Sequence, residues 1–188
     1  KLLRTGGCGC LLIACSKNRH FAIEERKSQV KNIGMLFCIF EKKRVLKNIL
    51  ETKGYTSIRL KKTKSQHLVA LLEVNSTEGL FLIDTGASSS CISADKEAHF
   101  TLTVKENTLE LSGAGSEKLE AKPTTKSSIA YNGLFLVTLK FFLLDMTSIN
   151  NSLSEQGNEM IDGIIGADFL KKTNALIDYK SKKLFLKL

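Results

Sequence analysis

The order and length of the apolar runs after residue 65 constrain the fold of this chain most strongly. Most of these runs have the length of a strand, and polar stretches with turn residues, such as Tyr131-Asn132-Gly133, separate them. Many short strands with little helix predict an all-β sandwich or barrel. The expected strands span residues 67–74, 79–83, 101–104, 108–112, 117–121, 125–131, 134–144, 161–165, 175–179 and 183–187.

Two short helices interrupt this pattern. Residues 41–52 place apolar side chains at helical spacing with basic residues opposite, and Gly54 follows as a stop signal, so a short amphipathic N-terminal helix is expected. A second short helix is expected at residues 167–173. The polar residues 147–160 predict a loop, and residues 75–78 predict the turn of a hairpin.

Charge divides the chain into two parts. Residues 1–64 carry 16 Lys and Arg against 4 Asp and Glu, whereas residues 65–188 carry 12 against 15. We therefore expect a basic N-terminal segment with a short helix over residues 1–64 and an all-β domain over residues 65–188. A basic segment can bind nucleic acid or anionic lipid. No aromatic residues are interleaved with these charges in a nucleic-acid-binding pattern, so a solvated segment without a specific nucleic-acid partner is favoured.

Cysteine usage indicates a reducing compartment. Four of the five cysteines lie in the first 38 residues at spacings that fit no zinc motif, and Cys91 stands alone. The cytoplasm is therefore the expected location, and no metal is expected.

The N-terminus leaves an alternative open. Leu12-Ile13-Ala14-Cys15 has the form of a bacterial lipoprotein cleavage site, but the apolar stretch before it is far shorter than a signal peptide requires. If Cys15 were lipidated, the protein would be anchored in the periplasm, and only then is membrane association expected. Met35 is an alternative start, which would make residues 1–34 non-native or disordered.

The apolar run Phe81-Leu82-Ile83 leads directly into Asp84. The run predicts a buried strand, which places the carboxylate at the edge of a cleft. Thr85 can hold the following loop through hydrogen bonds to the backbone, and Gly86 lets the backbone turn and another chain approach closely. Ala87 is small enough to lie under a ligand. This arrangement suits a carboxylate that performs acid or base chemistry.

A lone carboxylate cannot hydrolyse a peptide bond by the two-carboxylate route. That route needs one ionised carboxylate to activate water and one protonated carboxyl group to donate to the carbonyl oxygen. The chain contains no second Asp-Thr-Gly or Asp-Ser-Gly. Asp84 of a second copy is a candidate partner across a two-fold axis, and the two groups would then titrate as one unit. Any such catalytic role of Asp84 therefore requires a homodimer.

Residues 81–88 resemble the catalytic loop of retropepsin-like aspartic proteases, with an apolar run followed by Asp-Thr-Gly-Ala and a small polar residue. Residues 164–170 (IIGADFL) look like the later motif of that family, in which two apolar residues and a glycine lead into a short helix. Residues 111–116 occupy the place of the flap that closes over substrate. The resemblance covers about residues 67–188, and the tail at 175–187 looks more like bacterial than viral members.

The resemblance implies a closed retropepsin-like barrel or sandwich and an aspartic endopeptidase without metal or cofactor. It implies catalytic roles for Asp84, Thr85 and Gly86, and a peptide or protein as substrate. The substrate-binding residues that it implies are Ala87, Ser112, Gly113, Ala114, Gly115 and Ile165. Two alternatives remain open: an inactive module of the same fold that binds peptides or partners, and a protein whose function resides in the basic residues 1–64.

Two nearby features are not expected to be nucleophiles. Residues 88–90 (SSS) lack the glycine-flanked elbow of a serine hydrolase. Cys91 has no histidine placed to activate it. We expect a loop that continues the turn after Asp84 and a small buried thiol.

Overall fold

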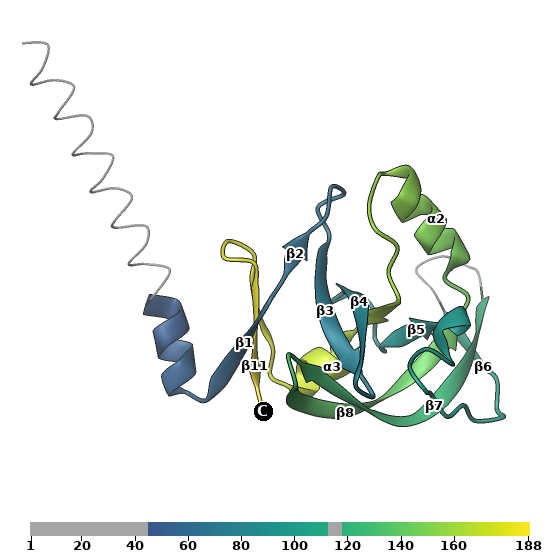
Figure 1. The fold of residues 1–188 in the computed structure, drawn as a ribbon, viewed down its shortest axis with the longest axis horizontal. Helices are drawn as coiled ribbons and strands as arrows, with labels where there is room; N and C mark the ends of the chain where they lie inside the picture. Colours follow the sequence, from purple (N-terminus) through teal and green to yellow (C-terminus); the bar gives the residue numbers. More distant parts are fainter. Residues whose placement is uncertain (1–44, 113–117) are drawn as a thin grey trace, which may run out of the picture. The chain divides into compact units, whose positions relative to one another are not determined.

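The structure of the protein, a computed structural model, describes residues 45–112 and 118–188 (Figure 1). Residues Lys47–Leu188 form one compact unit. Residues 45–52 are helical, and the part of the predicted helix before residue 45 lies outside the described residues. The strands are β1 (Tyr55–Arg59), β2 (Lys61–Lys62), β3 (Leu68–Val74), β4 (Thr77–Ile83), β5 (Cys91–Ser93), β6 (Leu109–Ser112), β7 (Lys118–Tyr131), β8 (Leu134–Leu144), β9 (Gly163–Ile165), β10 (Leu176–Asp178) and β11 (Lys183–Lys187). The helices are η1 (Ala94–Lys96), α2 (Thr147–Glu155) and α3 (Ala167–Lys172).

Six strands form a closed barrel. The larger sheet has the order β2-β3-β4-β9-β5-β8-β7-β6, and β3 also pairs with β7, which closes the ring β3-β4-β9-β5-β8-β7. The predicted all-β class and closed barrel are therefore confirmed. A second sheet has the order β1-β11-β10. Residues 55–62, which the charge division placed in the N-terminal segment, pair with β11 through β1 and with β3 through β2.

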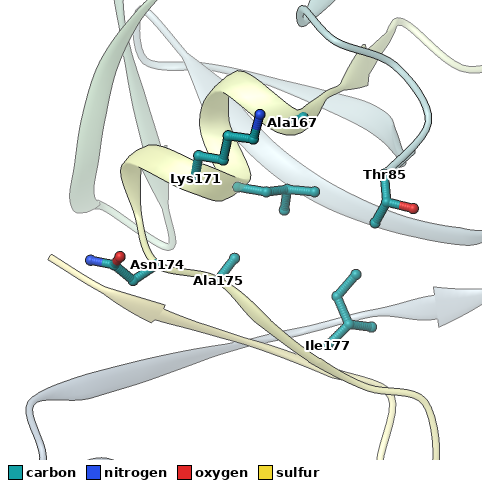
Figure 2. Close-up of a pocket in the computed structure, with 7 residues that line it drawn as sticks. Thr85, Ala167, Lys171, Asn174, Ala175 and Ile177 are labelled. Carbon is teal, nitrogen blue, oxygen red and sulfur yellow. The ribbon is translucent and has the colours of Figure 1, made fainter.

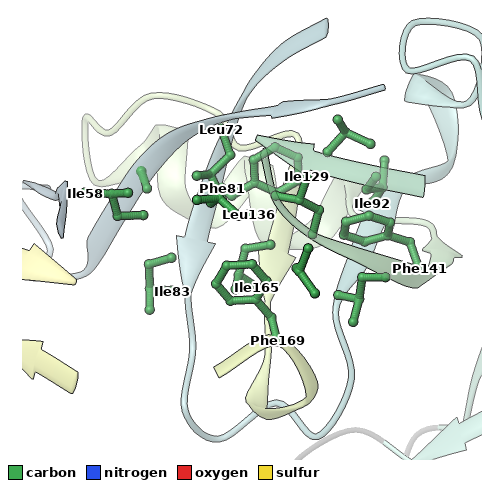
Figure 3. Close-up of a cluster of buried hydrophobic side chains, with 14 of the residues drawn as sticks. Ile58, Leu72, Phe81, Ile83, Ile92, Ile129, Leu136, Phe141, Ile165 and Phe169 are labelled. Carbon is green, nitrogen blue, oxygen red and sulfur yellow. The ribbon is translucent and has the colours of Figure 1, made fainter. Parts of the chain in front are cut away.

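Parts of β3, β4, β5, β8 and β9 carry apolar side chains on both faces of the barrel wall, which explains their nearly continuous apolar runs. Side chains that alternate along the strands fill the interior together with the buried side chain of α3 (Figure 3); the largest fully buried ones include Phe81, Phe141 and Ile165 from strands and Phe169 from α3. A second cluster forms on the other face of the wall, where Leu153 of α2 packs with residues including Val69, Cys91, Met146 and Ile161. Helix α2 therefore covers apolar surface on this face of the wall that would otherwise be exposed to water.

The prediction of a loop over residues 147–160 is wrong, because residues 147–155 form α2. Asp145 caps this helix: its Oδ1 accepts hydrogen bonds from the backbone N–H and the hydroxyl of Thr147, at 2.9 and 2.6 Å. Leu153 is the one residue of α2 that is buried. A helix rich in Ser and Asn with one buried side chain lacks the apolar periodicity on which sequence prediction depends.

Asn158, just after α2, ties this region to the turn between β2 and β3. Its Oδ1 accepts from the backbone N–H of Lys64 at 2.8 Å, and its Nδ2 donates to Ser65 Oγ at 3.0 Å. Nδ2 also contacts the carbonyl oxygen of Leu153 at 3.2 Å. The polar residues that suggested a loop therefore hold α2 against the barrel.

Two strand predictions also need correction. Residues 118–131 form one continuous strand, where two strands at 117–121 and 125–131 were expected. Residues 101–104 form no strand; they contribute a single bridge between Val104 and Thr124. Both hairpin turns are confirmed: Asn75-Ser76 and Asn132-Gly133 each have two positive φ angles, as a two-residue hairpin turn of type I′ requires. The strands β1, β2 and β5 were not predicted, because such short segments carry too little periodicity.

Gly163 offers a test of how tightly β9 is packed. A Cβ at this position would collide with the backbone oxygen of Cys91 and would lie 2.8 Å from a ring carbon of Phe81. We predict that Gly163→Ala lowers the free energy of unfolding by about 1–3 kcal/mol, measured by chemical denaturation. Gly86→Ala is the control, since among the residues that the structure describes the only neighbour of its Cβ within 4 Å is Asp84 Oδ1 at 3.2 Å. Equal stability of the two variants would contradict this account of β9.

Candidate active site

Asp84 lies where strand β4 leaves the barrel. β4 and β9 are parallel with Ile83 opposite Ile165, and the backbone N–H of Asp84 donates to the carbonyl oxygen of Ile165 at 3.0 Å. The side chain of Asp84 is half-buried, whereas Thr85 and Gly86 are exposed. The backbone N–H of Gly86 donates to Asp84 Oδ1 at 2.8 Å. This bond holds the carboxylate through one oxygen and forms an Asx-type turn, so the three predicted catalytic residues form one local unit.

The loop from Asp84 to Ser90 is fixed at further points to the turn that follows β9. The backbone N–H of Ala167 donates to the carbonyl oxygen of Ala87 at 2.7 Å. Ser90 donates twice to Asp168, from its backbone N–H to Oδ2 at 3.0 Å and from its hydroxyl to Oδ1 at 2.6 Å. The two motifs singled out from the sequence are therefore joined at residues 84, 87 and 90.

Gly166 allows this close approach. A Cβ at this position would lie 2.8 Å from the carbonyl oxygen of Ala87 and 2.8 Å from backbone atoms of Ser89. The backbone N–H of Gly166 donates to Ser90 Oγ at 2.9 Å. The glycine of the later motif is therefore required by the loop that carries Asp84.

The structure describes three of the six residues predicted to bind substrate: Ala87, Ser112 and Ile165. Ala87 is half-buried within the loop that carries Asp84. Ser112 ends β6, and Gly113, Ala114 and Gly115 lie outside the described residues. Ile165 is fully buried in the main core, so it packs beneath the loop and does not line an open cleft. We therefore correct the role of Ile165 from substrate contact to core residue.

A cavity of about 410 Å³ opens beside Thr85 (Figure 2). Helix α3, the segment after it and strand β10 supply its other walls, and the lining is mainly apolar. The lining residues are Thr85, Ala167, Leu170, Lys171, Asn174, Ala175 and Ile177. Asp84 is not among them, so the cavity lies next to the loop and does not contain the carboxylate. No local sequence pattern indicates this cavity.

Cys91 is a buried thiol, as expected. It is 4% exposed and free. Burial raises the pKa of the thiol from 9.0 to about 12; a backbone hydrogen bond involving Ile164 opposes this shift, and the charges of Asp168 and Asp84 add to it. The thiolate is therefore absent at neutral pH, and Cys91 is unsuited to act as a nucleophile.

This environment makes Cys91 unreactive in the folded protein. We predict that iodoacetamide at pH 8 labels Cys91 only after unfolding, measured for its own peptide by mass spectrometry. Because folding raises this pKa, the corresponding stabilisation is complete below pH 9.0 and is lost as the pH rises towards 12. Equal labelling rates in the folded and unfolded protein would contradict the burial of this thiol.

Sequence reasoning missed the role of Ser90 and Asp168. Ser90 was included in a general loop, and Asp168 was recognised only as part of the later motif. The pair is separated by 78 residues, so no local pattern connects the two. The signal that could have found them is the motif itself, because an acidic residue in the first turn of a short helix often accepts backbone hydrogen bonds.

Residues 70–169, more than half of the chain, match the family model described as aspartyl protease. The chain belongs to the aspartyl protease family. The resemblance seen in the two motifs is therefore confirmed. Over 106 residues the chain is 31% identical to the retrovirus-related Pol polyprotein from transposon 412 of Drosophila melanogaster. This match covers 55% of the chain but only 8% of the polyprotein, so the chain spans a small part of the length of its curated relative.

Three solved structures resemble this aspartyl protease family member at low identity. The retropepsin-like aspartic protease from Rickettsia conorii is 15% identical, with a TM-score of 0.44 and coverage of 71% of this chain and 90% of that chain. The retroviral protease-like domain of Ddi1 from Leishmania major is 18% identical, with a TM-score of 0.46 and coverage of 64% and 87%. The EIAV protease complexed with the inhibitor HBY-793 is 18% identical, with a TM-score of 0.38 and coverage of 55% and 85%.

Several predictions for this protease-family chain stay untested. Cys15 and residues 1–34 lie outside the described residues, so the cytoplasmic location and the alternative lipid anchor remain predictions. Within residues 45–112 and 118–188, no helix is long and apolar enough to cross a bilayer. In the same residues, no three His, Cys, Asp or Glu side chains gather as a metal-binding group. The bacterial origin suggested by the tail also remains a prediction.

Proposed function

We propose that this chain is an aspartic endopeptidase whose active site forms between two copies, each supplying Asp84. The observation that carries the proposal is the position of Asp84 at the exposed end of β4, in the first turn of a loop that is fixed to the barrel. Membership of the aspartyl protease family supports the reaction class. The presence of one Asp-Thr-Gly in the chain supports the second copy.

In the proposed mechanism, a water molecule lies between the two Asp84 carboxyl groups. Two carboxylates about 3 Å apart cannot both ionise, so the pair shares one proton. The ionised group takes a proton from the water, and the protonated group donates to the carbonyl oxygen of the peptide bond. The bond between Gly86 N–H and Asp84 Oδ1 orients each carboxylate before substrate binds.

The exposed neighbours of Asp84 fit this arrangement. Thr85 is exposed beside the carboxylate and would brace the two loops against each other at the two-fold axis. Ala87 and the expected flap at residues 111–116 would contact the substrate. These positions carry small or apolar side chains, so a peptide with apolar side chains at the cut is the proposed substrate class.

The first test is the loss of the carboxylate. We predict that Asp84→Asn lowers kcat for peptide hydrolysis by about 10²–10⁴-fold while leaving the protein folded and dimeric, since the amide cannot act as the base. Hydrolysis of a peptide library and sedimentation of the same sample provide the two readouts. Asp145→Asn is the matched control, because that carboxylate is exposed and caps α2. Activity that survives Asp84→Asn would overturn the proposal.

Mixing the parent with Asp84→Asn separates a shared site from two independent sites. If each site needs Asp84 from both copies, subunit exchange with an equal amount of the variant lowers activity to about one half, because about half of the parent chains pair with the variant. Activity that stays constant through complete exchange would mean that each copy acts alone. A protein that binds peptides but cleaves none would instead favour the inactive binding module.

A further inference from the structure

We propose that Ser90 and Asp168 are positioning residues for the carboxylate of Asp84. The hydrogen bonds between Ser90 and Asp168 fix the end of the loop that lies farthest from β4. Without them, the loop holds Asp84 less accurately against Asp84 of the second copy. Loss of these hydrogen bonds lowers kcat, whereas KM and dimerisation stay nearly unchanged. This inference rests on the proposed function and assigns two residues outside the Asp-Thr-Gly motif to it.

Ser90 joins the loop to helix α3 and to strand β8. It is fully buried, and its backbone N–H and hydroxyl both donate to the carboxylate of Asp168. Its Oγ also accepts from the backbone N–H of Gly166, at the start of α3. Its carbonyl oxygen accepts from the backbone N–H of Phe142 in β8 at 3.1 Å. Breaking these bonds is costly, because a buried polar group that loses its partner cannot form a hydrogen bond to water instead.

The distant end of the loop affects Asp84 because the loop is short. Backbone bonds fix residue 84 to Ile165 and residue 87 to Ala167. Beyond them, among the hydrogen bonds of residues 45–112 and 118–188, only those of Ser90 hold the loop to the turn after β9. Catalytic groups need placement within about 0.5 Å, and a displacement of about 1 Å can cost about 10²-fold in rate. Release of residues 88–90 therefore allows Asp84 and Thr85 to shift together.

The bonding pattern requires a carboxylate at position 168. Asp168 accepts from Ser90 N–H, from the Ser90 hydroxyl and from the backbone N–H of Phe169, the last at 2.8 Å to Oδ1. An asparagine has one acceptor oxygen, so its amide N–H₂ would face one of the Ser90 donors. Asp168→Asn therefore keeps the size of the side chain but replaces one hydrogen bond by a contact between two donors.

A matched control exists at the other end of β5. Ser93 is also buried, and its hydroxyl donates to Asp95 Oδ1. This pair also joins a buried serine hydroxyl to an aspartate, although Asp95 is exposed, and it lies at the start of η1. Among the described residues it makes no hydrogen bond to the loop of residues 84–90, so Ser93→Ala removes a buried hydroxyl and its bond to a carboxylate without releasing that loop.

The experiment compares Ser90→Ala, Asp168→Asn and their double variant with Ser93→Ala, in the full chain. We expect each of the first two to lower kcat by about 10- to 100-fold with KM within about twofold, and the double variant to lose little more than either alone. Ser93→Ala should keep the parent kcat even if its thermal stability falls as much as that of Ser90→Ala or Asp168→Asn. If kcat stays at the parent value in both single variants, or falls equally in Ser93→Ala, the inference is overturned.

Hydrogen exchange provides a readout that does not depend on catalysis. The amides of residues 84–90 should exchange faster in Ser90→Ala and Asp168→Asn than in the parent, and at the parent rate in Ser93→Ala. If the amide exchange rates of residues 84–90 are the same in the first two variants as in the parent, the positioning role is overturned. This result can be obtained even if the protein has no activity. A parent protein as inactive as Asp84→Asn would instead contradict the proposed function. If Ser90→Ala does not fold, Asp168→Asn, which preserves side-chain size, carries the test.

Discussion

The hydrogen bonds between the loop of residues 84–90 and the turn of residues 165–168 are the constraint on which the rest of the site depends. A loop that leaves a barrel strand has many conformations in water, and ordering each residue costs about 1–2 kcal/mol. Bonds at residues 84, 87 and 90 offset this cost and hold one conformation. The position of the Asp84 carboxylate is therefore fixed by hydrogen bonds to the barrel.

This constraint also explains why glycine occurs twice near β9. Gly163 lies between β4 and β5, where a Cβ would strike the backbone oxygen of Cys91, and Gly166 lies under the loop itself. The short strand β9 can be threaded beneath Asp84 only because these positions lack side chains. Ile165, between them, fills the core, so the same segment provides both the packing and the hydrogen bonds.

The sequence predicts the parts of this arrangement that depend on local chemistry. The apolar run before Asp84, the two hairpin turns and the short helix after Gly166 each follow from a few adjacent residues. The link between Ser90 and Asp168 could not be predicted, because it joins residues 78 positions apart and both are ordinary polar residues in isolation. Helix α2 was missed because its stability comes from a cap and one buried leucine. The burial of Ile165 was missed because an apolar residue beside a glycine fits a cleft wall as well as a core.

One chain supplies one Asp84, and two-carboxylate hydrolysis therefore depends on association. The most direct measurement is specific peptidase activity over a wide range of protein concentration, with sedimentation of the same samples. The account predicts that specific activity falls on dilution in proportion to the fraction of dimer, with both curves giving one dissociation constant. Specific activity that stays constant in samples containing only monomer would contradict it.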